Sequence, residues 1–136
     1  MSQGQQRIVP LNHIEEAVIL FTRLLVPVVI DVRGEPVFFD MGDYVHVMDD
    51  SERLRRIRWI RETLTHPDEI RRSHLASKPF RELYVARIWE SEDDQTGETF
   101  LVGVDRRFGR LDFRTAFVPM PSYLRQVREG RQLWPV

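Results

Sequence analysis

Apolar residues recur at intervals of three and four in two segments of the chain, the spacing of one buried helix face. The first segment, residues 13–25, follows Asn12, whose side chain can cap a helix, and ends before Pro27. The second, residues 52–64, follows the capping residues 49–51. We therefore predict two half-buried helices. Their apolar positions are Ile14, Ala17, Val18, Phe21, Leu24 and Leu25 in the first and Leu54, Ile57, Ile60 and Leu64 in the second.

β-branched and aromatic residues cluster in shorter segments, as is typical of strands. The predicted strands are 28–32, 37–39, 44–48, 81–89, 99–105 and 111–118. The turn at residues 33–36 joins the first two as a hairpin, and short connectors make the last three an antiparallel meander. We expect a turn at 67–72 and a loop at 73–80. A closing helix over 122–129 should end at Gly130, and the tail Leu133-Trp134-Pro135 should pack back on the domain. This order predicts an α+β fold, with N-terminal helices on a twisted antiparallel sheet.

Length and composition predict one domain over residues 1–136, with a helix and hairpin in residues 1–40. The apolar fraction of 42% suits a globular chain with one core. There is no cysteine, which fits a reducing cytoplasm. The longest apolar run is interrupted by Thr22, Arg23 and Pro27 and is too short to span a bilayer, and the first six residues lack signal-peptide features. We expect a soluble cytoplasmic protein.

The positive charge is almost entirely arginine. Lys78 is the only lysine among 20 basic residues, although the net charge is -1. Arginine presents a planar fork that suits phosphate, but a biased codon usage would give the same composition. The arginines of the second predicted helix suggest an RNA-binding stripe. Because they surround the helix, a solvated face is the favoured interpretation.

No metal or cofactor is expected. His66 and His74 are eight residues apart without a cysteine or a tight His/Asp pattern near them. The acidic stretches 49–50 and 92–94 lack the glycine and terminal glutamate of a calcium loop. The chain also has neither a nucleotide-binding glycine loop nor a nucleophile elbow.

From Tyr44 onward, the order of landmarks resembles the phage-type branch of the barnase–EndoU–colicin–RelE-like nucleases. His46 precedes a helix that runs into Ile60-Arg61-Glu62-Thr63-Leu64-Thr65-His66-Pro67-Asp68-Glu69-Ile70. An aromatic strand, a hydrophobic strand and a strand with Thr115-Ala116-Phe117 follow. The resemblance covers residues 44–136. It does not extend to a second histidine after the first, where this chain has Met48-Asp49-Asp50.

The resemblance implies metal-independent RNA cleavage by attack of the ribose 2′-hydroxyl on phosphorus. Such chemistry needs an acid or base, cations that stabilise the transition state, and a surface that holds a splayed base. His46 is the candidate acid or base because imidazole titrates near neutral pH. The other candidate catalytic residues are Arg87, Thr115 and Tyr84, and the candidate substrate-binding residues are Arg114 and Tyr123.

Each candidate also has a structural interpretation. A lone histidine in a strand is often a surface residue or a hydrogen-bonded structural residue, which would be the role of His46. Arg87 can pair with an acidic residue across the sheet. Thr115 alternates with Phe113 and Phe117, so it can be a buried filler, with Arg114 on the opposite face. Alternation likewise separates Tyr84 from Arg87, but both faces of that strand mix polar and apolar residues, so the pattern does not decide which face is buried.

The leading prediction is therefore an endoribonuclease of the bacterial toxin type, with RNA as substrate, tRNA as one candidate, and an antidote or other protein as a possible partner. The alternative is a non-catalytic interaction module that retains a nuclease-like fold. The missing second histidine and the near-neutral charge favour that alternative.

Overall fold

The computed structural model describes residues 11–47, 53–89 and 96–136. Its helices are α1 (Leu11–Leu24), η2 (Met41–Val47, a 3-10 helix), α2 (Arg53–Thr65) and α3 (Pro121–Val127). Its strands are β1 (Val28–Ile30), β2 (Pro36–Phe38), β3 (Glu69–Arg72), β4 (Arg81–Ile88), β5 (Glu98–Arg107), β6 (Arg110–Phe117) and β7 (Gln132–Trp134). The expected α+β class is confirmed.

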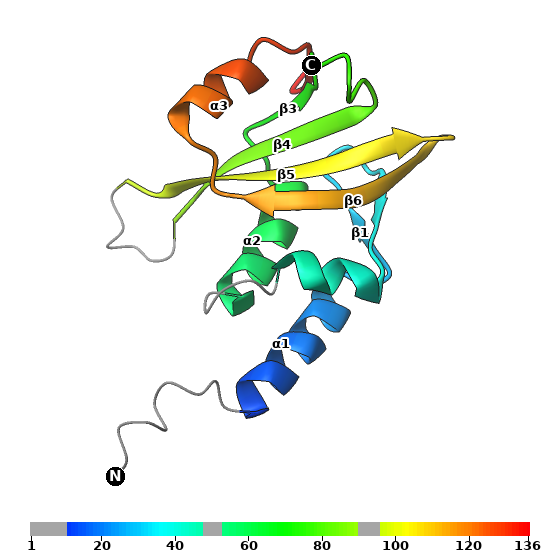
Figure 1. Ribbon diagram of the computed structural model, residues 1–136, viewed down its shortest axis with the longest axis vertical. Helices are drawn as coiled ribbons and strands as arrows, with labels where there is room; N and C mark the ends of the chain where they lie inside the picture. Colours follow the sequence, from blue (N-terminus) through cyan, green and yellow to red (C-terminus); the bar gives the residue numbers. More distant parts are fainter. Residues whose placement is uncertain (1–10, 48–52, 90–95) are drawn as a thin grey trace.

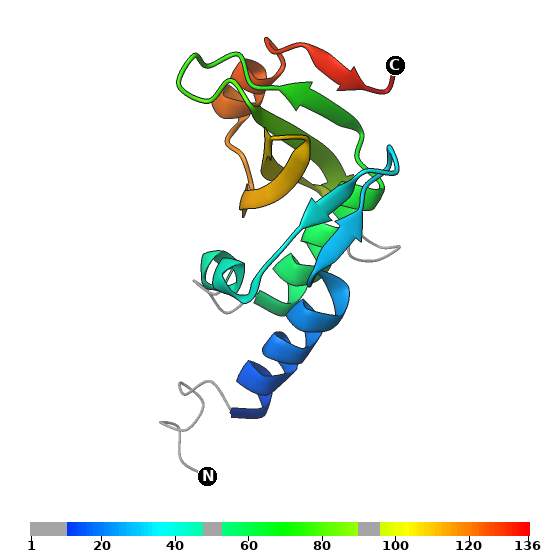
Figure 2. The ribbon, with the colours of Figure 1, turned by 90° about the vertical axis from the view of Figure 1, so that its right-hand side faces the viewer.

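All the strands form one curled sheet in the order β1-β2-β6-β5-β4-β3-β7 (Figures 1 and 2). The hairpin of β1 and β2 and the meander of β4, β5 and β6 are antiparallel, as predicted. The sheet is nevertheless mixed, because β2 runs parallel to β6, with Val37 opposite Leu111. A turn sets the register inside a hairpin. No local sequence pattern specifies whether β2 runs parallel or antiparallel to β6, which is distant in the sequence.

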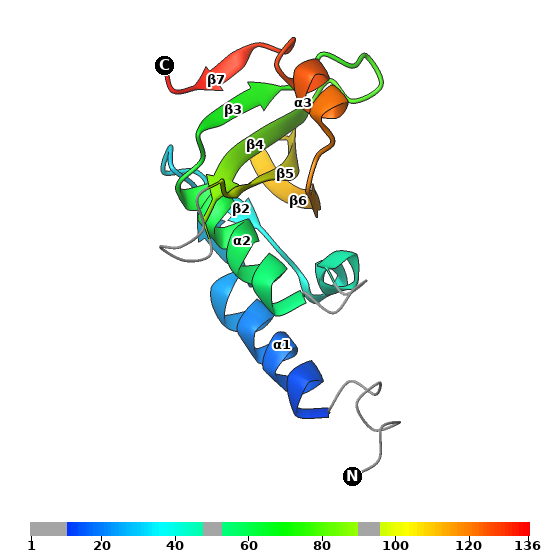
Figure 3. The same ribbon diagram turned by 90° about the vertical axis from the view of Figure 1, so that its left-hand side faces the viewer.

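Helices cover the two faces of the sheet unequally (Figure 1). The α2 face carries α1, α2 and η2, and α1 extends away from the sheet (Figures 1 and 3). Among the described residues, α3 is the one helix on the α3 face, where it packs on Leu83, Val85 and Leu101 through Val127. The larger part of the core therefore lies on the α2 face, and part of the α3 face is left for other contacts.

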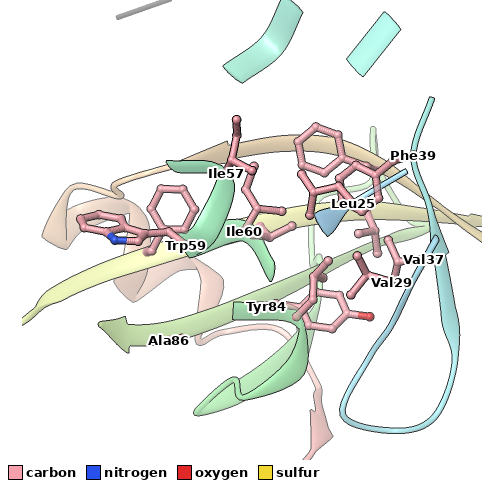
Figure 4. Packing of buried hydrophobic residues seen from close by; sticks show 14 of the residues in the cluster. Leu25, Val29, Val37, Phe39, Ile57, Trp59, Ile60, Tyr84 and Ala86 are labelled. Carbon is pink, nitrogen blue, oxygen red and sulfur yellow. The ribbon is translucent and has the colours of Figure 1, made fainter. Parts of the chain in front are cut away.

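Aliphatic and aromatic side chains together form the core on the α2 face (Figure 4). The rings of Phe39 and Phe113 stack with centroids 4.8 Å apart, and Trp59 meets Phe100 edge-on at 5.3 Å. Burial of one such side chain contributes roughly 1.5–3 kcal/mol. These contacts hold α2 and the β1–β2 hairpin against the sheet.

Two predicted elements are wrong. Residues 44–48 were expected to be a strand, but η2 occupies Met41–Val47. Its first turn is closed by reciprocal bonds, in which each backbone N–H of Asp40 and Asp43 donates to the other carboxylate, at 2.9 and 3.1 Å. Such local bonds compete with β-propensity. Residues 67–72 were expected to be a turn, but Glu69–Arg72 is a strand held by pairing with β4 and β7.

Candidate functional site

A carboxylate between two arginines marks the uncovered end of the α3 face. Asp105 Oδ1 accepts a hydrogen bond from Arg81 Nε at 2.9 Å, and Oδ2 accepts one from Arg114 Nε at 3.0 Å. Burial would raise the pKa of the Asp105 carboxyl, but hydrogen bonds and charge from the two arginines lower it below its ordinary value. The Asp105 side chain is 9% exposed and that of Arg114 is 49% exposed. The Arg114 guanidinium therefore retains room for a second anion.

A bulge brings Arg114 and Thr115 to the same face. Val104 pairs with Phe113, but Gly103 pairs with Thr115, so Arg114 is an extra residue in β6. The expected placement of Arg114 on the opposite face from Thr115 is therefore wrong. Thr115 lies beside Gly103, where a Cβ would stand 3.0 Å from Thr115 Cγ2 and 3.6 Å from Arg81 Cδ. Because Gly103 has no side chain, no atom fills the space between Thr115 and Arg81 at this position.

A small hollow of about 20 Å³, enough for one water, lies next to this cluster, between the loop after β3 and α3. Its lining residues are Ser73, His74, Leu75, Leu83, Tyr123, Gln126 and Val127. Leu83 connects the two sites, because its Cδ2 lies 3.5 Å from the position of a Cβ on Gly103. Tyr123 is held edge-on against Phe117, with ring centroids 5.4 Å apart. Arg114, Thr115 and Tyr123 thus occupy one region.

Arg87 lies on the same face but at its other end. It is opposite Thr99 in β5, four residues from Gly103, which faces Thr115. With strand spacings of about 3.3 Å along and 4.8 Å across, the backbones of Arg87 and Thr115 are roughly 16 Å apart. The buried side chains of Val85 and Leu101 lie between them under α3. These two side chains do not meet at one phosphate.

Tyr84 lies on the α2 face and is completely buried (Figure 4). Its hydroxyl donates a 2.6 Å hydrogen bond to Asp31 Oδ2 and accepts one from Arg33 at 2.9 Å. Burial and the bond to Asp31 raise the pKa of Tyr84 well above its ordinary value. The phenol therefore stays protonated and acts as a donor inside the fold, away from the face that holds Thr115.

The same network fastens the β1–β2 turn to the sheet. Arg33 also donates to Glu82 Oε1 at 2.8 Å, and Arg106 bridges Glu82 and Glu35. Glu82 is buried and Glu35 is part-buried, and each accepts charge-assisted bonds. Paired groups of this kind fix one geometry, since an unpaired buried charge would be costly. The arrangement explains a structural role for these residues.

His46 lies in η2, which contacts α1, α2 and β6. Its side chain lies outside the described residues, so its catalytic role stays a prediction. From the sequence, His74 had no role beyond an unsupported metal site, yet this residue lines the hollow beside Tyr123. Arg81 and Asp105 were not singled out either. Arg81 and Asp105 lie directly opposite each other in β4 and β5. Finding this pair from the sequence would have required the register of the two strands.

The described residues contain no group of three or more His, Cys, Asp or Glu side chains placed to hold a metal ion. Among these residues, no helix has the length and apolar character needed to cross a membrane.

The curled seven-stranded mixed sheet, with α1, α2 and η2 on one face and α3 on the other, places the chain in the α+β class of folds. Comparison with family models gives the particular family. The model of the phage-Barnase-EndoU-ColicinE5/D-RelE like nuclease2 family matches residues 16–135, and the chain belongs to this family. The match begins well before Tyr44, so it includes most of α1 and the β1–β2 hairpin. Comparison with curated proteins and with solved structures found no significant match.

Proposed function

We propose that this protein is a metal-independent endoribonuclease of the bacterial toxin type, acting on RNA in the cytoplasm, with tRNA as one candidate substrate. The observation that carries the proposal is the cluster of Arg81, Asp105 and Arg114 beside Thr115, on an open sheet face of a nuclease-family chain. A phosphodiester offers the charge and acceptor oxygens that two guanidinium groups and a hydroxyl bind.

The reaction needs no external group. The ribose 2′-oxygen forms a bond to phosphorus and gives up its proton to a base, while the bond from phosphorus to the 5′-oxygen breaks and an acid protonates that oxygen. Arg114 and Thr115 would stabilise the charge that builds on the phosphoryl oxygens. His46 is the proposed acid or base, because η2 lies against β6, the strand of Arg114 and Thr115, and Asp43 of η2 lines one cavity together with Arg114. His74, at the rim of the neighbouring hollow, is the second histidine to be tested for this role.

The test is cleavage of tRNA and total RNA by purified protein in the presence of EDTA. The expected products carry 2′,3′-cyclic phosphate and 5′-hydroxyl ends. His46→Ala should abolish cleavage, and His74→Ala tests the alternative assignment. His66→Ala is the matched control, because this exposed histidine bonds to Thr65 and Glu62 at the end of α2, on the other side of the sheet. RNA that remains as intact as in buffer alone would refute the enzyme proposal for those substrates.

A second candidate function is a protein-interaction module without catalysis. The specific observation in its favour is the burial of Tyr84 together with the separation of Arg87 from Thr115, which leaves fewer groups around one phosphate. The two candidates differ in growth assays. A toxin expressed alone should arrest the host and be rescued by the product of a neighbouring antidote gene, whereas an interaction module should be tolerated at the same expression level.

A further inference from the structure

We infer that Phe108, at the tip of the hairpin between β5 and β6, stacks on an unpaired base of the RNA whose phosphate lies at Arg81 and Arg114. This inference rests on the proposed ribonuclease function and adds to it a second contact with the substrate, away from the reacting phosphate. Three observations support it: the exposure of the ring, the backbone conformation that holds it, and the charged face that connects the tip with the candidate site.

The Phe108 ring takes no part in the core. Its residue is 105% exposed, whereas Phe80 and Trp89, the other exposed aromatic residues in the part of the chain that the structure describes, are 57% and 53% exposed. The hairpin that carries it, where β5 turns into β6, projects beyond the neighbouring strands (Figure 1). A phenyl ring stabilises a fold only through the area that it buries, so this ring contributes nothing to the packing of the domain.

The backbone at the tip disfavours a phenylalanine. Arg107 pairs with Arg110, so Phe108 and Gly109 form a two-residue turn, with φ of 55° and 76°. Positive φ at both positions is the pattern of a type I′ turn, which favours Asn-Gly, and it is strained for a bulky side chain. A single exposed apolar residue is common, but here the exposed ring also carries backbone strain that no packing contact offsets. Strained positions of this kind cluster where proteins hold ligands.

Charged side chains connect the tip with the candidate site along the α3 face. Arg110 Nε donates to Asp112 Oδ1 at 2.9 Å, and Asp112 lies opposite Asp105, whose Oδ2 accepts the bond from Arg114. Arg110 and Arg114 also line the same cavity, which has a volume of about 160 Å³. The tip and the arginine cluster therefore border one continuous surface.

The distance along this surface suits one strand of RNA. Phe108 and Arg114 are about five strand steps apart once the bulge is allowed for, which spans roughly 17 Å at 3.3 Å per residue. Stacked nucleotides of one strand rise about 3.4 Å each, so roughly five of them cover this length. An RNA strand with a phosphate at Arg114 can therefore present a base to the ring.

The charge around the ring favours RNA over an apolar partner. Arg107 and Arg110 are exposed on either side of Phe108. Burial of the ring in an apolar interface would desolvate these two cations, which is costly. A polyanion leaves them in a favourable field, and an aromatic ring stacks on a base of any sequence. We therefore expect a contact that strengthens binding without selecting one base.

The experiment measures binding without cleavage. Fluorescence anisotropy gives the affinity for a labelled single-stranded 2′-O-methyl RNA of about ten nucleotides, which lacks the attacking hydroxyl and is long enough to span both contacts. Phe108→Asn should weaken binding roughly tenfold, within the range that one base–aromatic stack contributes. Phe108→Tyr retains a ring and should bind like the parent protein. Ile19→Asn is the control, because it removes an exposed apolar side chain of α1, and it should leave the affinity unchanged.

Thermal unfolding provides a second readout. Asparagine is favoured at this position of a type I′ turn, so Phe108→Asn should raise Tm by about 3 °C as the strain is relieved. Weaker RNA binding together with higher stability is the result expected of a ring that serves a ligand. A variant that had lost its fold would instead lose both.

The outcomes separate this inference from the proposed function. If Phe108→Asn binds the RNA as tightly as the parent protein, or if Phe108→Tyr is as weak as Phe108→Asn, the stacking contact is refuted, even when RNA is cleaved. A lower Tm of Phe108→Asn would give the ring a structural role and would also refute it. If binding depends on the ring while no RNA is cleaved in EDTA, the contact stands and the enzyme proposal fails.

Discussion

The position of the Tyr84 hydroxyl decides what this residue contributes. The oxygen lies between Asp31 and Arg33, at 2.6 and 2.9 Å, and the ring is enclosed by the core (Figure 4). Removal of the hydroxyl would leave a buried carboxylate with one donor fewer. The Tyr84 side chain therefore stabilises the folded state. It is buried on the α2 face and cannot reach a substrate on the other face.

Tyr84→Phe should lower the free energy of unfolding by roughly 1–3 kcal/mol, the cost of leaving a buried polar partner unsatisfied. Urea denaturation at neutral pH measures this change. The ribonuclease activity per folded molecule should stay the same. A variant with parental stability and no activity would instead restore Tyr84 as a catalytic residue.

Asp105 links stability to the charge of the candidate site. Its carboxyl pKa in the folded state lies below the unfolded value of about 3.9. The pair with Arg81 and Arg114 therefore contributes stability above about pH 4, and this contribution is lost as pH falls through the lowered folded pKa.

Asp105→Asn should lower stability at pH 7 by roughly 1–2 kcal/mol, a value kept small because Arg114 is half exposed. It should also reduce the loss of stability between neutral and acid pH, and it should bind 2′-O-methyl RNA more tightly, since two guanidinium groups are released. Urea unfolding at pH 7 and below pH 4 measures the two stability effects. Fluorescence anisotropy of a labelled 2′-O-methyl RNA measures the affinity. Asp112→Asn is the control, because its pair with Arg110 is largely exposed. Equal behaviour of the two variants would contradict this account.

At the scale of elements, Gly130 was correctly singled out in the sequence, but its role in the structure differs from the predicted one. Gly130 was expected to end a helix over 122–129, but α3 ends at Val127. The glycine is required because a Cβ there would overlap the Arg72 carbonyl oxygen. This close approach lets the Arg72 N–H donate to the Arg131 carbonyl oxygen at 2.8 Å, where β3 and β7 meet.

Gly130→Ala should therefore destabilise the protein by about 3 kcal/mol, because backbone must move to accommodate the methyl group. Gly34→Ala is the comparison. A Cβ at Gly34 meets nothing within 4 Å, so only its positive φ of 83° is strained, at a cost of about 1 kcal/mol. Thermal unfolding of the two variants ranks the costs. If Gly34→Ala proves the more harmful, the packing of β7 on β3 is looser than these contacts indicate.

At the scale of the molecule, periodicity predicted the elements whose partners are near in sequence. It found α1, α2, the β1–β2 hairpin and the meander, and it placed Tyr84 and Arg87 on opposite faces. It did not decide which face is buried, because α3 covers Val85 and Leu101 on the second face as well. The direction of β2, the strand β3 and the site formed by Arg81, Asp105 and His74 depend on contacts between distant segments, which no local pattern specifies.

The distribution of charge over the whole molecule sets how RNA binding should depend on salt. The net charge is -1, and many arginines are committed to acidic partners, among them Arg33, Arg106 and Arg128. Binding through Arg81 and Arg114 alone would release few counterions. The slope of log K against log salt for a single strand should then be about -1.4, from roughly 0.7 per phosphate contact.

Fluorescence-anisotropy titrations of a labelled 2′-O-methyl RNA oligonucleotide, which lacks the attacking hydroxyl, measure this slope between low and physiological salt. A slope steeper than about -4 would require several more phosphate contacts and would assign RNA binding to the arginines of α2. Arg58→Ala separates the two cases, because Arg58 is exposed on α2 and remote from the α3 face. The variant should keep the parental slope if RNA binds at the cluster around Asp105, whereas Arg114→Ala should reduce it.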